Sequence, residues 1–184
     1  PMKYHDGTLG LLDVKDRNIE KSTLIEGSQK TIDEHNERLL DDPVTGTLGD
    51  GAAALDMFSK GNTNSFCERL SEHFYAPRLR IESGLRLREI ASSCIDISDG
   101  LVADLRHICF YSGVAAEIDC SLIPIHAHTK RNYPHHSLHW ALSGGDDYQL
   151  CFTVPERATE SLKKMIFEGH IDATRIGLIT AGDG

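Results

Sequence analysis

The stretch Asp96–Gly100, with the sequence DISDG, places two carboxylates and a hydroxyl at the end of a short apolar run. The β-branched residues before it predict a short buried strand over Cys94–Ile97. Strand side chains alternate, so we expect Asp96 and Ser98 on one face, with Asp99 opening a helix whose first free N–H groups attract anions. Such oxygen atoms suit Mg²⁺ carrying phosphates. An ordinary helix cap is the competing interpretation, and a carboxylate at Asp96 in an apolar strand weakens it, because such a group needs a partner.

Two further strings combine glycines with acids. Ser143–Tyr148 reads SGGDDY, so its paired glycines let backbone amides approach a ligand, and two adjacent acids precede an apolar run. Val44–Gly51 reads VTGTLGDG and lacks the Gly-Lys-Ser/Thr ending of a P-loop. Taken singly, each string is better explained by an ordinary polar turn beside a strand or helix.

Five histidines between residues 126 and 139 form a separate group. Their spacing matches neither Cys-x-x-Cys nor His-Glu-x-x-His, the patterns typical of zinc sites. We therefore interpret this segment as a solvated loop that is rich in histidine, with a transition-metal site as the weaker alternative.

Composition limits the classes of function. The formal net charge of −9 argues against a general nucleic-acid surface, which needs a basic patch. Carboxylates that hold divalent metals can still attract phosphates. The five cysteines form no Cys-x-x-Cys pair, which indicates free thiols of a reducing compartment. No run approaches the roughly 20 apolar residues of a membrane span, and residues 1–6 lack the form of a signal peptide, so the expected location is cytoplasmic.

The pattern of apolar and polar residues changes near Pro43. Residues 1–43 are polar and weakly patterned, with a short strand expected over 7–13 and a helix over 29–40. From residue 44 onward, β-branched runs alternate with amphipathic segments, which predicts an α/β (α+β) domain over 44–184. Its expected strands cover 44–48, 94–97, 114–118, 148–154 and 174–180, its helices cover 50–59, 64–74, 80–91, 101–111 and 156–167, and a loop covers 121–137.

In this order, the three strings resemble thiamine-monophosphate kinase, a family in the superfamily of aminoimidazole ribonucleotide synthetase. The matching segments are Val44–Ala53, Pro77-Arg78, Ile95–Leu101, Leu142–Leu150 and Ile176–Thr180. The resemblance covers residues 44 to nearly 184, and several motifs in order are far more specific than one. It implies the C-terminal domain of that superfamily, a mixed sheet packed with helices.

The resemblance also implies an activity, the transfer of a phosphoryl group from ATP to thiamine monophosphate to give thiamine diphosphate. Carried over by position, Asp96 and Asp99 become Mg²⁺ ligands, Ser98 an ATP contact and Asp146 a contact of the thiamine substrate. Positioning and charge neutralisation dominate phosphoryl transfer, which suits clustered acids with Mg²⁺. The family makes its homodimer through an N-terminal domain, and neither a nucleic-acid nor a membrane partner is expected.

Two departures from the family keep alternatives open. Asp146 stands where the family has Glu, which draws the carboxylate back by one C–C bond, about 1.5 Å. Residues 1–43 lack the family's Gly-Asp-Asp motif, so they are either a divergent or truncated remnant of the N-terminal domain or an unrelated segment. The alternatives to the kinase are a non-catalytic nucleotide-binding or structural remnant and another ATP-using enzyme of the superfamily.

Overall fold

The computed structural model describes residues 4–5, 8–9, 22–24, 46–61 and 65–182. The strands are β1 (Tyr4–His5), β2 (Thr8–Leu9), β3 (Ser22–Leu24), β4 (Ser93–Ile97), β5 (Val114–Ile118), β6 (Gln149–Pro155) and β7 (Gly177–Ala181). The α-helices are α2 (Asp50–Ser59), α3 (Ser65–Tyr75), α4 (Ile81–Leu87), α5 (Leu101–Ser112), α6 (Ala127–Asn132), α7 (Ser137–Ser143) and α8 (Thr159–Phe167). Two short 3₁₀-helices, η1 (Cys120–Leu122) and η2 (Glu156–Ala158), complete the described elements.

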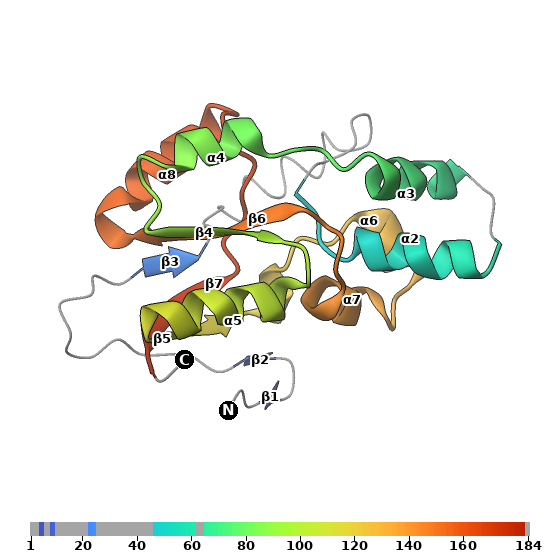
Figure 1. The fold of residues 1–184 in the computed structure, drawn as a ribbon, viewed down its shortest axis with the longest axis horizontal. Coiled ribbons are helices and arrows are strands. Elements are labelled where there is room, and N and C mark those ends of the chain that lie inside the picture. Colours follow the sequence, from blue (N-terminus) through green and yellow to red (C-terminus); the bar gives the residue numbers. More distant parts are fainter. Residues whose placement is uncertain (1–3, 6–7, 10–21, 25–45, 62–64, 183–184) are drawn as a thin grey trace.

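A five-stranded sheet in the order β4-β6-β3-β7-β5 forms the centre of the fold (Figure 1). β3 lies between β6 and β7 and pairs antiparallel with both, with Thr23 opposite Val154 on one side and Leu178 on the other. β6 and β7 therefore run parallel to each other without being neighbours. The expected class, a sheet packed with helices, is confirmed, although every pairing among the described strands is antiparallel where mixed directions were expected.

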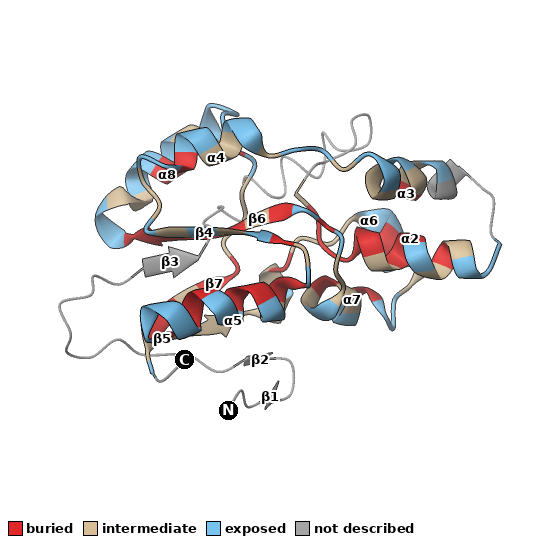
Figure 2. Ribbon diagram, in the orientation of Figure 1, coloured by how far each residue is buried: buried red, intermediate tan, exposed pale blue. Residues whose placement is uncertain are grey.

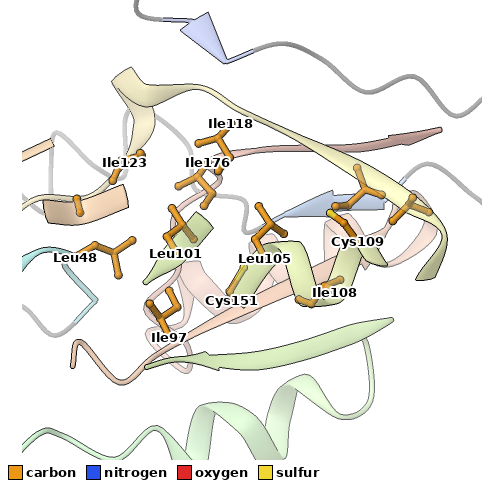
Figure 3. Packing of buried hydrophobic residues seen from close by; sticks show 13 residues of the cluster. Leu48, Ile97, Leu101, Leu105, Ile108, Cys109, Ile118, Ile123, Cys151 and Ile176 are labelled. Carbon is orange, nitrogen blue, oxygen red and sulfur yellow. The ribbon is translucent and has the colours of Figure 1, made fainter. Parts of the chain in front are cut away.

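Helices cover both faces of this sheet (Figure 1, Figure 2). On one face, α5 contributes Leu101, Leu105 and Ile108 to the largest apolar cluster (Figure 3). On the other face, α4 and α8 pack through a second cluster. Strand β6 serves both clusters, because Cys151 joins the first and Phe152 the second, as alternation along a strand requires.

A third cluster lies where α2 meets α3, α6 and α7. Ala53 and Met57 of α2 are buried there against Leu70 of α3. The rings of Tyr133 and Trp140 pack edge to face with their centroids 4.8 Å apart, which adds an aromatic contact to the cluster. This group of helices holds the start of α2 beside the end of β4 and the start of β6. The three strings that contain glycines and acids meet there.

Most expected elements are present, and three expectations are corrected. Residues 46–48 form no strand, and a bend covers Leu48 and Gly49, because the Thr47 hydroxyl donates to Asp50 at the start of α2 and the Leu48 N–H donates to the carbonyl of Pro124. The expected loop over 121–137 contains most of η1 and all of α6. The helix expected over 80–91 is the shorter α4, on which Leu85 is exposed.

Three expectations reach residues outside the described ranges. The helix expected over residues 29–40 lies outside the described residues. Of the strand expected over residues 7–13, the described residues Thr8–Leu9 form β2. Of the strand expected over residues 44–48, residues 44 and 45 lie outside the described part.

Candidate functional site

The turn from β4 into α5 is closed by a carboxylate that the sequence did not reveal. Asp104 is 3% exposed, and its Oδ2 accepts the backbone N–H groups of Ser98 at 3.0 Å, Asp99 at 3.1 Å and Gly100 at 3.2 Å. Gly100, the residue before the helix, has φ +116°, a conformation that favours glycine. These three amides, which precede α5, are thus already bonded to Asp104 and are not free to bind a phosphate.

The two carboxylates expected to bind metal both face solvent. Asp96 and Asp99 are exposed, and Ser98 between them is half-buried. The expectation that the strand is buried holds for Ile97 but not for Asp96, because β4 is the edge strand of the sheet. Asp96 therefore keeps its hydration and needs no protein partner, which removes the desolvation argument and leaves an accessible oxygen donor.

The loop from α7 into β6 continues the pairing of β4 with β6. The N–H of Tyr148 donates to the carbonyl of Ile97 at 2.8 Å, and the N–H of Asp146 donates to the carbonyl of Ser98 at 3.0 Å. Ser98, the expected ATP contact, and Asp146, the expected substrate contact, are thus joined by a main-chain hydrogen bond. Asp146 and Tyr148 have φ values of +64° and +50°, which are uncommon for residues other than glycine and often found at functional sites.

The hydroxyl of Tyr148 donates a hydrogen bond to Oδ1 of Asp146 at 3.0 Å. This bond and the charge of Asp146 raise the pKa of Tyr148, and the charge of Asp96 adds to the effect. The Tyr148 hydroxyl therefore stays protonated at neutral pH and remains a donor. Asp96, Asp146 and Tyr148 thus lie together on the exposed side of the β4–β6 pair.

Asp147, which lies between Asp146 and Tyr148 in the sequence, points into the protein and not toward solvent. It is 0% exposed and accepts the N–H of Gly49 at 2.6 Å and that of Gly51 at 3.0 Å, so it joins the Ser143–Tyr148 string to the Val44–Gly51 string. Nε2 of His73 lies 3.8 Å from its Oδ1. Burial raises the pKa of Asp147, and the contacts with His73, Gly51 and Gly49 only partly oppose this.

The three strings approach so closely that their contacts need glycine. A Cβ atom at Gly51 would lie 2.5 Å from the carbonyl oxygen of Gly145, and one at Gly145 would lie 2.5 Å from the carbonyl oxygen of Ser98. Both obstacles are backbone atoms, which cannot rotate away. The backbone of Gly145 therefore packs between those of Gly51 and Ser98, and this packing brings the three strings into one site.

Asp50, the first residue of α2, has a structural role. Its carboxylate is fully buried and accepts hydrogen bonds from the hydroxyls of Thr47 and Thr129 and from Nη2 of Arg69. Burial alone would raise the pKa of Asp50, but the charge of Arg69 and these hydrogen bonds outweigh it, and the pKa is lowered. Asp50 fixes the start of α2 to α3 and α6 and leaves no lone carboxylate for a ligand.

A small cavity lies beside the β4–β6 pair, and the volume inside it that the centres of water molecules can reach is about 40 Å³. Ile97, Leu101 and Phe152 are among its mainly apolar lining residues. Arg80 also lines it and donates from Nε to Oε1 of Gln149 at 2.7 Å. Ile97 directly precedes Ser98, and Gln149 directly follows Tyr148. Because both residues line the cavity, the cavity adjoins the site.

The histidines of the 126–139 segment have structural contacts. His126 precedes α6 and accepts the N–H of His128, and the ring of His136 stacks on Trp140. Within the described ranges, no group of three His, Cys, Asp or Glu side chains is arranged to hold a metal ion. In the same part of the chain, every helix is too short or too polar to cross a membrane.

Sequence comparison relates residues 44–184 to the family described as AIR synthase related protein, C-terminal domain. The thiamine-monophosphate kinase of Escherichia coli K12 is 41% identical over 142 residues, which cover 75% of this chain and 44% of that protein. The enzyme of the same name from Buchnera aphidicola subsp. Schizaphis graminum is 38% identical over 144 residues, covering 76% and 45%. The chain thus spans less than half the length of these two relatives.

Two solved structures share the fold of this chain. The thiamine-monophosphate kinase of Stenotrophomonas maltophilia K279a superposes with a TM-score of 0.73 at 31% identity, over 94% of this chain and 51% of that one. AaThiL complexed with AMPPCP and TMP superposes with a TM-score of 0.68 at 28% identity, over 91% and 47%. The fold described above is therefore the fold of these proteins, over about half of their length.

Proposed function

Because this chain belongs to the AIR synthase related protein family through that family's C-terminal domain, we propose that it acts in the ATP-dependent phosphorylation of thiamine monophosphate to thiamine diphosphate. Relatives named for this reaction and a neighbour complexed with AMPPCP, an ATP analogue, and TMP support the proposal. The observation that carries it is the main-chain bond between Asp146 and Ser98, which joins the expected substrate contact to the expected ATP contact.

Asp96 and Asp99 are the residues that we assign to Mg²⁺. Both are exposed carboxylates, the Ser98 hydroxyl lies between them in the chain, and such an all-oxygen set fits an ion that takes one or two carboxylates and completes its shell with phosphates and water. When bound, Mg²⁺ neutralises phosphate charge and so stabilises the transition state of phosphoryl transfer. The chain's own contribution is to hold these oxygens in place, which the three bonds from the turn to Asp104 achieve.

This arrangement makes nucleotide binding dependent on the cation. The amides of Ser98, Asp99 and Gly100 are occupied by Asp104, and the nearby side chains Asp96, Asp99 and Asp146 are acidic. Phosphate approaching without a cation meets like charges, so we expect ATP to bind with Mg²⁺ and not in its absence.

The direct test is the formation of thiamine diphosphate from thiamine monophosphate, ATP and Mg²⁺ by the folded chain. Product that requires all three components supports the proposal. A folded chain that binds neither ATP with Mg²⁺ nor thiamine monophosphate contradicts it.

A second candidate is a non-catalytic domain that binds the nucleotide without turnover. The observation that favours it is that Asp96 and Asp99 have no third metal-ligating side chain grouped with them within the described residues. Nucleotide binding with Mg²⁺ but no thiamine diphosphate would identify this alternative. Another ATP-using activity of the superfamily would give ATP consumption with a different acceptor.

The remaining proposals concern the setting of the chain. We propose a cytoplasmic location, a homodimer made through the N-terminal part and no nucleic-acid partner, the last supported by the net charge of −9. For the organisation of the chain, we propose a kinase C-terminal domain over 44–184 and a divergent N-terminal segment over 1–43. The position of β3 inside the main sheet supports a structural role for at least Ser22–Leu24 of that segment.

A further inference from the structure

Tyr148 is an exposed aromatic residue directly before β6. Its side chain is 38% exposed, and its hydroxyl donates to the carboxylate of Asp146 at 3.0 Å. Its backbone φ of +50° is uncommon for a bulky residue, and its N–H is held by the carbonyl of Ile97. The backbone thus holds the ring at the start of β6, beside the two acids Asp96 and Asp146.

The chemistry of the proposed substrate matches this arrangement. Thiamine monophosphate carries a thiazolium ring, which is aromatic and permanently cationic. The face of a tyrosine ring attracts a cation, and carboxylates beside it add to the attraction. The Asp146 carboxylate accepts the hydrogen bond of the Tyr148 hydroxyl, which places negative charge beside that end of the ring.

We propose that Tyr148 is a specificity-determining residue for the thiamine substrate, with its hydroxyl orienting the Asp146 carboxylate and its ring face receiving the thiazolium cation. This inference rests on the proposed function. It gives Tyr148 two separable roles, because phenylalanine keeps the ring and removes the hydroxyl, whereas leucine removes both and keeps apolar volume.

The test uses isothermal titration calorimetry of the full chain with two ligands, in the presence of Mg²⁺. One is thiamine monophosphate, and the other is its deaza analogue, in which a neutral thiophene replaces the thiazolium. For Tyr148→Phe we expect Kd to rise about threefold for both ligands, because Asp146 loses its hydrogen-bond donor. For Tyr148→Leu we expect a further rise of about two- to fivefold for thiamine monophosphate alone, because only that ligand offers a cation to the ring.

Tyr111→Phe and Tyr111→Leu are the matched controls. Tyr111 is 82% exposed near the far end of α5, ten residues or about 15 Å along the helix from Leu101, and we expect its replacement to leave both Kd values unchanged. Thermal unfolding of all four variants checks that the fold is kept.

The outcomes separate this inference from the function on which it rests. A wild-type chain that binds thiamine monophosphate while both Tyr148 variants bind it equally well overturns the role of Tyr148 and leaves the proposed function standing. Equal losses of both ligands in Tyr148→Leu overturn the contact between ring and cation. A wild-type chain that binds neither ligand overturns the proposed function and, with it, the inference.

Discussion

Replacing Asp104 by alanine removes the acceptor of three backbone N–H groups at once. Hydrogen bonds to a charged group contribute about 1.5–3 kcal/mol each, but these three share one oxygen atom and do not add fully. We therefore expect Asp104→Ala to lower the free energy of unfolding by about 3–5 kcal/mol, a large part of the 5–15 kcal/mol typical of a domain. Asp104→Asn keeps an oxygen acceptor without its charge, and we expect it to cost about 1–2 kcal/mol.

The assay is urea denaturation of the wild type and both variants, followed by circular dichroism and compared at equal m values. Glu160→Gln is the matched control, because Glu160 is also an acid in the first turn of a helix, α8, but is exposed and forms a surface ion pair with Lys163. We expect it to change the free energy of unfolding by less than about 0.5 kcal/mol. If Asp104→Ala costs no more than Glu160→Gln, the turn does not depend on Asp104, and our account of how Asp96 and Asp99 are positioned is wrong.

Three further predictions concern the packing of the site and of the sheet. Gly145→Ala should destabilise the chain by about 1–3 kcal/mol and weaken ATP binding, since its Cβ would meet the carbonyl oxygen of Ser98; unaltered calorimetry would refute the close approach. The lowered pKa of Asp50 adds stability that is present above the unfolded pKa of about 3.9 and is lost as pH falls through the folded pKa. The difference in free energy of unfolding between the wild type and Asp50→Asn should therefore become smaller in acid denaturation below about pH 4. A difference that stays constant with pH would contradict the pairing of Asp50 with Arg69. Thr23→Pro should speed hydrogen exchange in β6 and β7, because proline breaks the ladder of a central strand, whereas Thr8→Pro in the separate β1–β2 sheet should not.

Local patterns in the sequence predicted most of the elements around the site. The apolar spacing of Leu101, Leu105 and Ile108 indicated α5, and Gly113, in the left-handed conformation with φ +60°, ends that helix as expected. Helix α6 escaped prediction because its sequence, AHTKRN, has no apolar periodicity. It is held instead by the bond from Thr129 to Asp50, which lies 79 residues away in the chain.

The sequence singled out Asp96, Asp99 and Asp146 as candidate site residues, but it did not single out the buried carboxylates of Asp104 and Asp147 that hold the surrounding turns. Asp104 lies three residues after Leu101 on a helix whose apolar residues face the core, and this position was the available signal that its carboxylate is buried. For Asp147 no local signal existed, since its partners Gly49 and Gly51 are nearly 100 residues away. The stacking of Gly51, Gly145 and Ser98 likewise depends on contacts between distant segments, which patterns within one segment do not encode.

The affinity for ATP with Mg²⁺ and with excess EDTA, measured for the wild type and for Asp96→Asn, tests the central claim most directly. Cys94→Ser is the control, because Cys94 is exposed two residues earlier on the same face of β4. We expect the wild type and the control to bind ATP only with Mg²⁺, and Asp96→Asn to bind at least about tenfold more weakly at an unchanged Tm. ATP binding that is equally tight in EDTA, or unchanged in Asp96→Asn, would contradict the assignment of this turn as a site for magnesium and nucleotide.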